Sequence, residues 1–184
     1  MTDYTLQPIP GKTLSRRLPE GTALVLEGGG LRGYYSCGVM EAFMEKDLLF
    51  PYIIGVSAGA ANALSYISGQ PGRSREIIEH YVGNPDYVST RNLLTKHTMF
   101  DFDYIFGTVP EKHIFFDWDK FHEQDTRFLT GAMNCADGKT VWFEKDTLKA
   151  PFMASRASCS VPLITKIQHY MGYDLLDGGI SDPI

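Results

Sequence analysis

The strongest constraint on the fold of this chain is a pattern that occurs twice in its first half: a short apolar run, a glycine-rich turn and a helical segment. The apolar runs are residues 23–27 and 52–54, and the turns are residues 28–33 and 55–59. Short apolar runs bounded by turn residues are typical of buried parallel strands. Because strands that alternate with helices form parallel sheets, the sequence predicts an α/β fold.

The two helical segments differ in polarity. The second, residues 58–68, contains no charged side chain, which predicts a buried helix, and Gly69 is well placed to end it. The first begins at residue 34 and is amphipathic. Its predicted apolar face consists of Tyr35, Val39, Met40, Phe43 and Met44.

The rest of the chain gives weaker patterns. Prolines and glycines interrupt residues 1–21, so we expect an irregular lead-in there, followed by one domain over residues 22–184. Asp137-Gly138 between two strand-like runs predicts a hairpin. The other expected elements are a helix over 73–82, short helices and loops over 84–119, hairpin strands over 126–135 and 140–143, a helix over 148–159, and strands over 163–168 and 173–176.

The composition argues against several classes of function. The net charge is -5 and the basic residues are scattered, so we expect no nucleic-acid partner, because phosphate binding needs a clustered positive surface. The three cysteines are widely spaced and no Cys/His cluster occurs, which indicates neither a disulfide framework nor a metal site. No apolar run is long enough to span a bilayer. We expect a cytoplasmic protein that meets lipid peripherally, from the aqueous side.

The second glycine turn matches the G-x-S-x-G motif of serine hydrolases. Its five residues are Gly55-Val56-Ser57-Ala58-Gly59, between a predicted strand and a predicted helix. A serine in such a turn points its hydroxyl away from the sheet, and the helix N-terminus favours negative charge on that oxygen. The motif also arises by chance in a glycine-rich chain, but its strand-to-helix context favours Ser57 as a nucleophile.

The first glycine turn, residues 28–33, permits two interpretations. It matches G-x-G-x-x-G, the fingerprint of dinucleotide-binding proteins, yet that site needs an acidic residue at the end of the next strand, and residues 52–55 supply none. Alternatively, its consecutive glycines expose backbone N–H groups that stabilise the oxyanion of acyl transfer. Arg32 either holds this loop or attracts an anionic headgroup, or it is a solvated surface cation.

A serine nucleophile needs a base, and the sequence offers one good candidate. Asp177 follows an apolar pair and precedes Gly178-Gly179, which places it at a strand end with a tight turn after it. It accepts the serine proton if desolvation raises its basicity, or it is a turn aspartate that binds local N–H groups. No histidine follows Asp177 or lies in a recognisable motif, so none is assigned. The five histidines are His80, His97, His113, His122 and His169.

Taken together, three segments resemble the signature blocks of patatin-like phospholipases, in the order of that family. They are residues 27–33, 55–59 and 177–179. Residues 156–162 are similar to a block that these proteins carry before the acid. The resemblance runs from about Ala23 to the C-terminus and is closest to the bacterial branch of the family.

The resemblance implies a patatin-like three-layer α/β sandwich with a mainly parallel central sheet, and a catalytic domain over residues 22–184. It implies hydrolysis of fatty acyl esters of a lipid or acyl-ester substrate, without metal or other cofactor, and with transient contact to a membrane surface. The reaction would use a Ser-Asp dyad of Ser57 as nucleophile and Asp177 as base. The supporting residues would be Gly28, Gly29 and Gly30 as oxyanion donors, Arg32 and Gly33 beside them, and Gly55 and Gly59 around the nucleophile.

Family members usually continue well beyond the acid motif, whereas this sequence ends at Ile184. We therefore expect the C-terminal part of the domain to be missing from it. Two other functions stay open on the sequence. One is a nucleotide-binding protein that uses the glycine loop, and the other is a catalytically inactive patatin-like scaffold.

Overall fold

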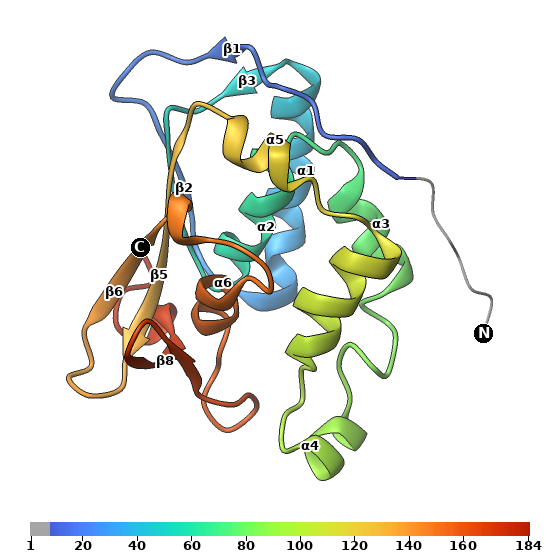
Figure 1. Ribbon diagram of the computed structural model, residues 1–184, viewed down its shortest axis with the longest axis vertical. Coiled ribbons are helices and arrows are strands. Elements are labelled where there is room, and N and C mark those ends of the chain that lie inside the picture. The colour runs from blue at the N-terminus through green and yellow to red at the C-terminus, as the bar shows by residue number, and fades with distance from the viewer. Residues whose placement is uncertain (1–7) are drawn as a thin grey trace.

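A six-stranded sheet organises the chain, which a computed structural model describes over residues 8–184 (Figure 1). Strands β2, β4 and β5 are parallel, whereas β6 and β8 run antiparallel to β5, and β7 antiparallel to β8. The α/β prediction is confirmed, with a mixed sheet. The six strands are β2 Ala23–Leu26, β4 Tyr52–Val56, β5 Arg127–Asn134, β6 Thr140–Glu144, β7 Gln168–Tyr170 and β8 Tyr173–Asp177.

The α-helices gather on one side of this sheet (Figure 1). Residues 8–184 therefore show a sheet layer and a helix layer of the expected sandwich. The helices are α1 Tyr34–Glu45, α2 Ala58–Ile67, α3 Arg73–His80, α4 Thr90–Lys96, α5 Trp118–Glu123 and α6 Met153–Ser158. Shorter 3-10 turns cover Gly30–Gly33, Lys145–Thr147 and Gly178–Ile180, and a π-helix covers Tyr104–His113.

Helix α2 lies at the centre of the core, as its lack of charge predicts. Ala60, Ala63, Tyr66 and Ile67 are all fully buried. The helix packs against β4 on the inner face of the sheet, where Ile53 is also fully buried. Gly69 follows the helix with a φ of +60°, a left-handed conformation that suits glycine.

The order of pairing along β5 decides which loops meet. β4 pairs with residues 127–131 of β5, and β8 pairs with residues 132–134. β6 pairs with the opposite edge of β5, over residues 129–133. β4 and β8 therefore lie on the same edge of β5, one after the other. β8 is antiparallel, so the carboxyl ends of β4 and β8 point toward each other.

Two expectations about burial in the first part of the chain hold only in part. β2 is parallel to β4 as expected, but it lies at the end of the strand order, and Val25 is 55% exposed instead of buried. The buried residues of α1 are Cys37, Met40 and Met44, whereas Tyr35 is 82% exposed. Apolar residues occur on several faces of α1, so their spacing alone could not select the inner one.

The lead-in is more regular than expected. Arg16–Arg17 form strand β1, which pairs in parallel with β3, Leu48–Leu49, and Leu14 belongs to the main core. Residues 1–7 lie outside the described residues. The domain boundary at residue 22 stays a prediction.

Two predicted elements near the C-terminus are shorter in the structure. The helix expected over 148–159 begins only at Met153, because Pro151 has no N–H to donate and Phe152 has a left-handed φ of +62°. The strand expected over 163–168 begins at Gln168. Residues 161–165 form a turn instead, in which the Thr165 N–H donates to the Val161 carbonyl at 3.0 Å. The predicted hairpin is confirmed as β5 and β6.

Candidate active site

The meeting ends of β4 and β8 bring the predicted nucleophile and the predicted base together. Ser57 follows β4, and Asp177 is the last residue of β8. Across β5, Val56 pairs with Gly131 and Asp177 pairs with Ala132, so the two side chains belong to consecutive positions along one edge. The Ser57 hydroxyl donates to Asp177 Oδ2 at 2.6 Å. Two residues far apart in the sequence are thus in direct contact.

Asp177 is held firmly in its buried position. Its side chain is 5% exposed, its Oδ1 accepts the Gly179 N–H at 2.8 Å, and its own N–H donates to the Ser160 carbonyl at 2.8 Å. Burial raises the pKa of this carboxyl above its ordinary value, and the hydrogen bonds from Ser57 and Gly179 oppose that rise. A carboxylate that is desolvated in this way is a stronger base than an exposed one. Asp177 therefore binds a local N–H, as a turn aspartate does, and also the Ser57 hydroxyl.

Ser57 has a backbone conformation that is rare outside glycine. Its φ is +54° and its ψ is -129°, at the junction of β4 and α2. Such a conformation costs roughly 1–3 kcal/mol and persists only where the surroundings fix it. Here it turns the hydroxyl out of the sheet and toward Asp177.

Gly55 and Gly59 are required by the close packing of this turn. A Cβ on Gly55 would lie 2.8 Å from the backbone of Ala60, and a Cβ on Gly59 would lie 2.1 Å from the Leu26 carbonyl oxygen. Both distances are shorter than real Cβ contacts. The two glycines therefore let α2 start directly against the ends of β2 and β4.

The glycine loop lies next to Ser57, because β2 and β4 are parallel neighbours whose carboxyl ends coincide. A Cβ on Gly28 would lie 2.9 Å from the Ser57 Cβ and 3.6 Å from its Oγ. Gly29 and Gly30 have φ values of +152° and +55°, which side chains rarely adopt. Within residues 8–184, the backbone N–H groups of Gly28 and Gly29 donate to no protein acceptor. They are free to donate to a ligand beside the serine.

The two other residues predicted to support the loop differ in their roles. Gly33 is buried against α2, where the Asn62 amide donates to its carbonyl at 3.1 Å. Arg32 is exposed, and within residues 8–184 its side chain forms no ion pair or hydrogen bond, so the structure places it as a surface cation near the loop. Its backbone N–H donates to the Gly29 carbonyl at 3.2 Å.

Ser158, which the sequence motifs did not single out, connects the site to the sheet. Its Oγ accepts the Ser57 N–H at 2.7 Å and donates to the Gly131 carbonyl at 2.6 Å. Ser158 is fully buried at the end of α6. It lies within residues 156–162, the segment that resembles a family block, and that resemblance was the only sequence signal for it.

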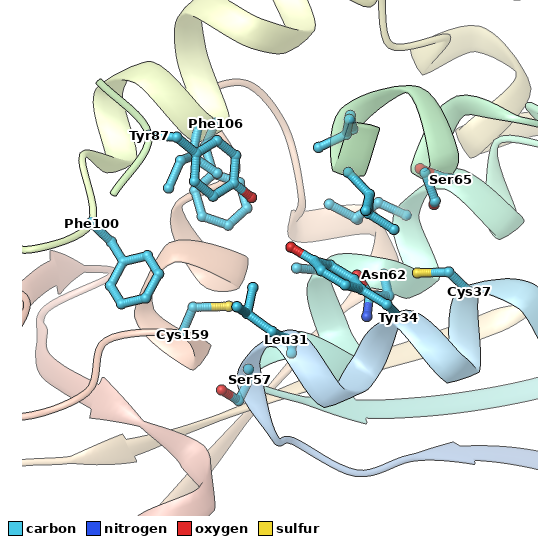
Figure 2. Close-up of a pocket in the computed structure, with 18 of the residues that line it drawn as sticks. Leu31, Tyr34, Cys37, Ser57, Asn62, Ser65, Tyr87, Phe100, Phe106 and Cys159 are labelled. Carbon is cyan, nitrogen blue, oxygen red and sulfur yellow. The ribbon is translucent and has the colours of Figure 1, made fainter. Parts of the chain in front are cut away.

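A largely apolar cavity of about 210 Å³ opens from Ser57 into the helix layer (Figure 2). Gly30 and Leu31 of the glycine loop line it on one side, and the π-helix contributes Phe106. Figure 2 shows Ser57, Leu31 and Cys159 in the lower part of the view, Phe100 to the left of Cys159, and Tyr87 and Phe106 above them. Further lining residues come from α2, α3, residues 84–119 and the start of α6, and include Leu64, Ile77, Ile78, Phe102, Ile105 and Phe152. An apolar cavity that begins at a hydroxyl suits an acyl chain.

None of the five histidines, all of which lie in the described residues, lines this cavity. His169 pairs with Asp174, and His122 stacks on Trp118. Residues 8–184 contain no group of three His, Cys, Asp or Glu side chains arranged to hold a metal ion. Across the same residues, no helix combines the length and the hydropathy that a bilayer crossing demands.

Known proteins are similar to this chain over most of its length. Protein YjjU of Escherichia coli K12 is 29% identical over 98% of this chain and 51% of its own length. An NTE family protein of Mycobacterium tuberculosis H37Rv is 27% identical over 88% of this chain and 43% of its own. The chain thus spans about half the length of the curated relatives it matches.

A solved structure and a family model also match this chain. The crystal structure of VipD from Legionella pneumophila aligns with a TM-score of 0.49 and 15% identity, and covers 100% of this chain and 52% of that one. The family model described as patatin-like phospholipase matches residues 24–184. Because that match covers nearly all of the sequence and includes all three motif blocks, the chain belongs to the patatin-like phospholipase family.

Proposed function

We propose that this protein is a serine-dependent lipid acyl hydrolase that cleaves fatty acyl esters through a Ser57–Asp177 dyad. Family membership supports a lipid hydrolase in general. The observation that carries the specific proposal is the 2.6 Å hydrogen bond between Ser57 Oγ and a buried carboxylate at the mouth of an apolar cavity. A hydroxyl paired with a desolvated base is the arrangement that activates a serine nucleophile.

The reaction follows from these positions. Asp177 Oδ2 takes the Ser57 proton as Oγ attacks the ester carbonyl carbon, and the same proton passes to the leaving alcohol when the C–O bond breaks. The acyl-enzyme that remains is then attacked by water, which gives its proton to Asp177. Release of the fatty acid returns the proton to Ser57. The whole cycle needs one base and no redox partner.

The glycine loop supplies the electrostatic part of catalysis. The carbonyl oxygen becomes negative in each tetrahedral intermediate. Gly28 packs against Ser57, and the N–H groups of Gly28 and Gly29 have no acceptor within residues 8–184. One such preorganised donor lowers the barrier by about 3 kcal/mol. The start of α2 adds the positive end of its helix dipole at Ser57.

The cavity defines the substrate as an acyl ester with an apolar chain. Among the residues that line it, Leu31 and Val161 are 57% and 39% exposed, and Leu163, two residues after Val161, is 94% exposed. Exposed apolar residues at the entrance of an apolar cavity favour transfer of a chain from a lipid surface. We therefore include transient contact with a membrane or micelle surface in the proposal.

Hydrolysis of p-nitrophenyl esters by purified protein tests the dyad. Wild-type protein should release p-nitrophenol from medium-chain esters. Ser57→Ala should remove turnover, and Asp177→Asn should reduce it by about a hundred- to ten-thousandfold. Circular dichroism must show that both variants are folded. Full activity of folded Asp177→Asn would identify another base and contradict the proposed dyad.

The nucleotide-binding alternative has weaker support in the structure. Gly28 packs against Ser57, and β4 ends without a carboxylate that would hold a ribose. A saturable rise in melting temperature with NAD or ATP would favour that alternative. A folded protein that neither cleaves esters nor binds a nucleotide would favour the inactive scaffold.

A further inference from the structure

The cavity contains a buried cation that the reaction described above does not use. Arg73, the first residue of α3, lines the cavity and is 5% exposed. Its Nη1 donates to Ser65 Oγ at 3.0 Å, and its Nη2 donates to the Ile114 carbonyl at 3.3 Å. Its guanidinium lies 5.0 Å from the centre of the Phe116 ring.

These neighbours leave the charge of Arg73 uncompensated. Its Nε is buried without an acceptor, and no carboxylate within residues 8–184 forms an ion pair with it. Burial lowers the pKa of Arg73 to about 10, and Tyr87 acts in the opposite sense. The guanidinium is therefore still charged at neutral pH. A buried charge without a partner costs several kcal/mol, so such a group indicates a ligand that supplies the opposite charge.

The position of Arg73 fixes where that ligand charge would lie. Ser65, which binds Arg73, is eight residues after Ser57 along α2. At about 1.5 Å of rise per residue, it lies about 12 Å farther along the helix. Figure 2 shows Ser57 and Ser65 on opposite sides of the view. Mostly apolar side chains line the cavity that connects these two positions, among them Leu64 and Ile77.

We propose that the cavity selects acyl esters whose acyl chain ends in a carboxylate, so that the ester carbonyl lies at Ser57 and the terminal carboxylate pairs with Arg73. The proposal rests on the acyl-hydrolase function above and names the substrate class of that site. An extended chain of roughly eight to ten carbon atoms spans the helical distance. The substrates are therefore half-esters of medium-chain dicarboxylic acids.

Carboxylate is the anion that fits this end of the cavity. A guanidinium binds a carboxylate through two parallel N–H···O bonds, and the Arg73 Nε–H has no acceptor within residues 8–184. Because the Nε atom is buried, a small rotation of the Arg73 side chain has to accompany binding of the carboxylate. Ser74 also lines the cavity and offers a further hydroxyl. The apolar walls admit the methylene chain, while a neutral chain end would leave Arg73 unpaired.

Three p-nitrophenyl esters of one chain length test the proposal in wild-type protein: the half-ester of nonanedioic acid, its methyl-capped form, and the nonanoate ester. We expect kcat/KM for the half-ester to exceed that of the methyl-capped form at least about tenfold, the effect of one desolvated charge pair. Equal hydrolysis of all three esters would overturn the proposal and leave the acyl-hydrolase function intact.

Three variants on α3 separate recognition from a purely structural role of Arg73. Arg73→Gln should lower the ratio of kcat/KM for the half-ester to kcat/KM for the methyl-capped form about tenfold, whereas Arg73→Lys should restore part of this preference. Arg75→Gln removes the same charge from an exposed position of the same helix and should change neither value. Equal losses on both substrates in folded Arg73→Gln would assign Arg73 a structural role and contradict the proposal.

A binding measurement covers the case in which no ester is turned over. Ser57→Ala protein is titrated calorimetrically with the monomethyl and the dimethyl ester of nonanedioic acid. Tighter binding of the monomethyl ester supports the carboxylate site even if the proposed catalysis fails. Equal or absent binding of both overturns it.

Discussion

At the residue scale, Ser57 and Asp177 each pay an energetic penalty that a purely structural residue would avoid. Ser57 holds a strained backbone conformation, and Asp177 holds a buried carboxyl whose pKa is raised by desolvation. Strain and desolvation at the same contact are typical of catalytic sites, where binding a reacting group matters more than stability. Both residues were selected by sequence motifs, but their contact could not be read from spacing, because it depends on the pairing along β5.

The raised pKa of Asp177 predicts opposite pH effects on activity and on stability. The base must be ionised, so kcat/KM should fall as the pH drops through its folded pKa, which lies above 3.8. The folded state favours the protonated carboxyl of Asp177. This group therefore adds to the free energy of unfolding at low pH, and its contribution is lost as the pH rises through the folded pKa.

Asp177→Asn cannot ionise, so it should melt above wild type at neutral pH. The gap should narrow as the pH is lowered from neutral through the folded pKa toward the ordinary value of 3.8. Thermal unfolding over this range measures it. A variant that melts below wild type at neutral pH would show that ionised Asp177 stabilises the fold and would contradict the expected sign.

Ser158 is a positioning residue whose removal should affect both stability and turnover. Ser158→Ala leaves the Ser57 N–H and the Gly131 carbonyl without their common partner and should cost about 1–3 kcal/mol of unfolding free energy. Ser155 is a matched control on α6, because it is fully buried and its Oγ has no hydrogen-bond partner. Ser155→Ala should therefore be neutral or slightly stabilising.

Urea denaturation and ester hydrolysis of the two variants provide the comparison. Ser158→Ala should also lower kcat with little change in KM, because it supports the nucleophile and does not touch the acyl chain. Equal behaviour of both variants would remove Ser158 from the positioning role.

At the element scale, close contact between the start of α2 and the end of β2 holds the site together. The uncharged sequence of α2 predicted its burial correctly, and the glycines on either side of Ser57 predicted a tight turn. The inner face of α1 and the burial of β2 were predicted only in part: Met40 and Met44 are buried as expected, but Tyr35 and Val25 are exposed. An apolar residue at the end of a sheet or on the outer side of a helix looks the same in sequence as a buried one.

Gly59→Ala tests the contact between α2 and β2. The added methyl would lie 2.1 Å from the Leu26 carbonyl, so backbone must move, and the variant should lose more than about 2 kcal/mol of unfolding free energy. Gly38→Ala in α1 has open space at the same atom and should gain roughly 0.5–1 kcal/mol from helix propensity. Chemical denaturation measures both. Ordinary surface substitutions change the free energy of unfolding by less than roughly 0.5 kcal/mol. A loss within that range for Gly59→Ala would contradict the tight contact between α2 and β2.

At the scale of the whole molecule, the sheet brings four distant segments to one end of an apolar cavity. Motifs in the sequence identified the glycine loop, the serine turn and the acid, but not Ser158 or the cavity. Arg73 was also missed, because nothing in its sequence neighbours distinguishes it from an exposed helical arginine such as Arg75. Its burial depends on the aromatic segment 84–119, where poor periodicity gave no prediction beyond short helices and loops.

The exposed apolar mouth of the cavity predicts a difference between dispersed and aggregated substrates. Leu163→Glu places a charge on a residue that is 94% exposed, so the fold should be unaffected. Turnover of esters in vesicles should fall several-fold, because the variant loses the contact of one leucine side chain with the lipid surface. Turnover of a soluble ester should stay the same. Leu94→Glu is the control, because Leu94 is 80% exposed and, unlike Leu163, is not within two residues of a side chain that lines the cavity. Equal effects of both variants on vesicle turnover would contradict docking through the mouth.

The central claim is that the Ser57 hydroxyl is an activated nucleophile, and covalent labelling with a fluorophosphonate probe tests it most directly. The probe reacts with serines that a neighbouring base activates and does not require the natural substrate to be known. We predict a single modified peptide that carries the probe on Ser57, loss of labelling in Ser57→Ala, and strongly slowed labelling in Asp177→Asn. A folded wild-type protein that the probe leaves unmodified, or modifies at a serine other than Ser57, would contradict the account.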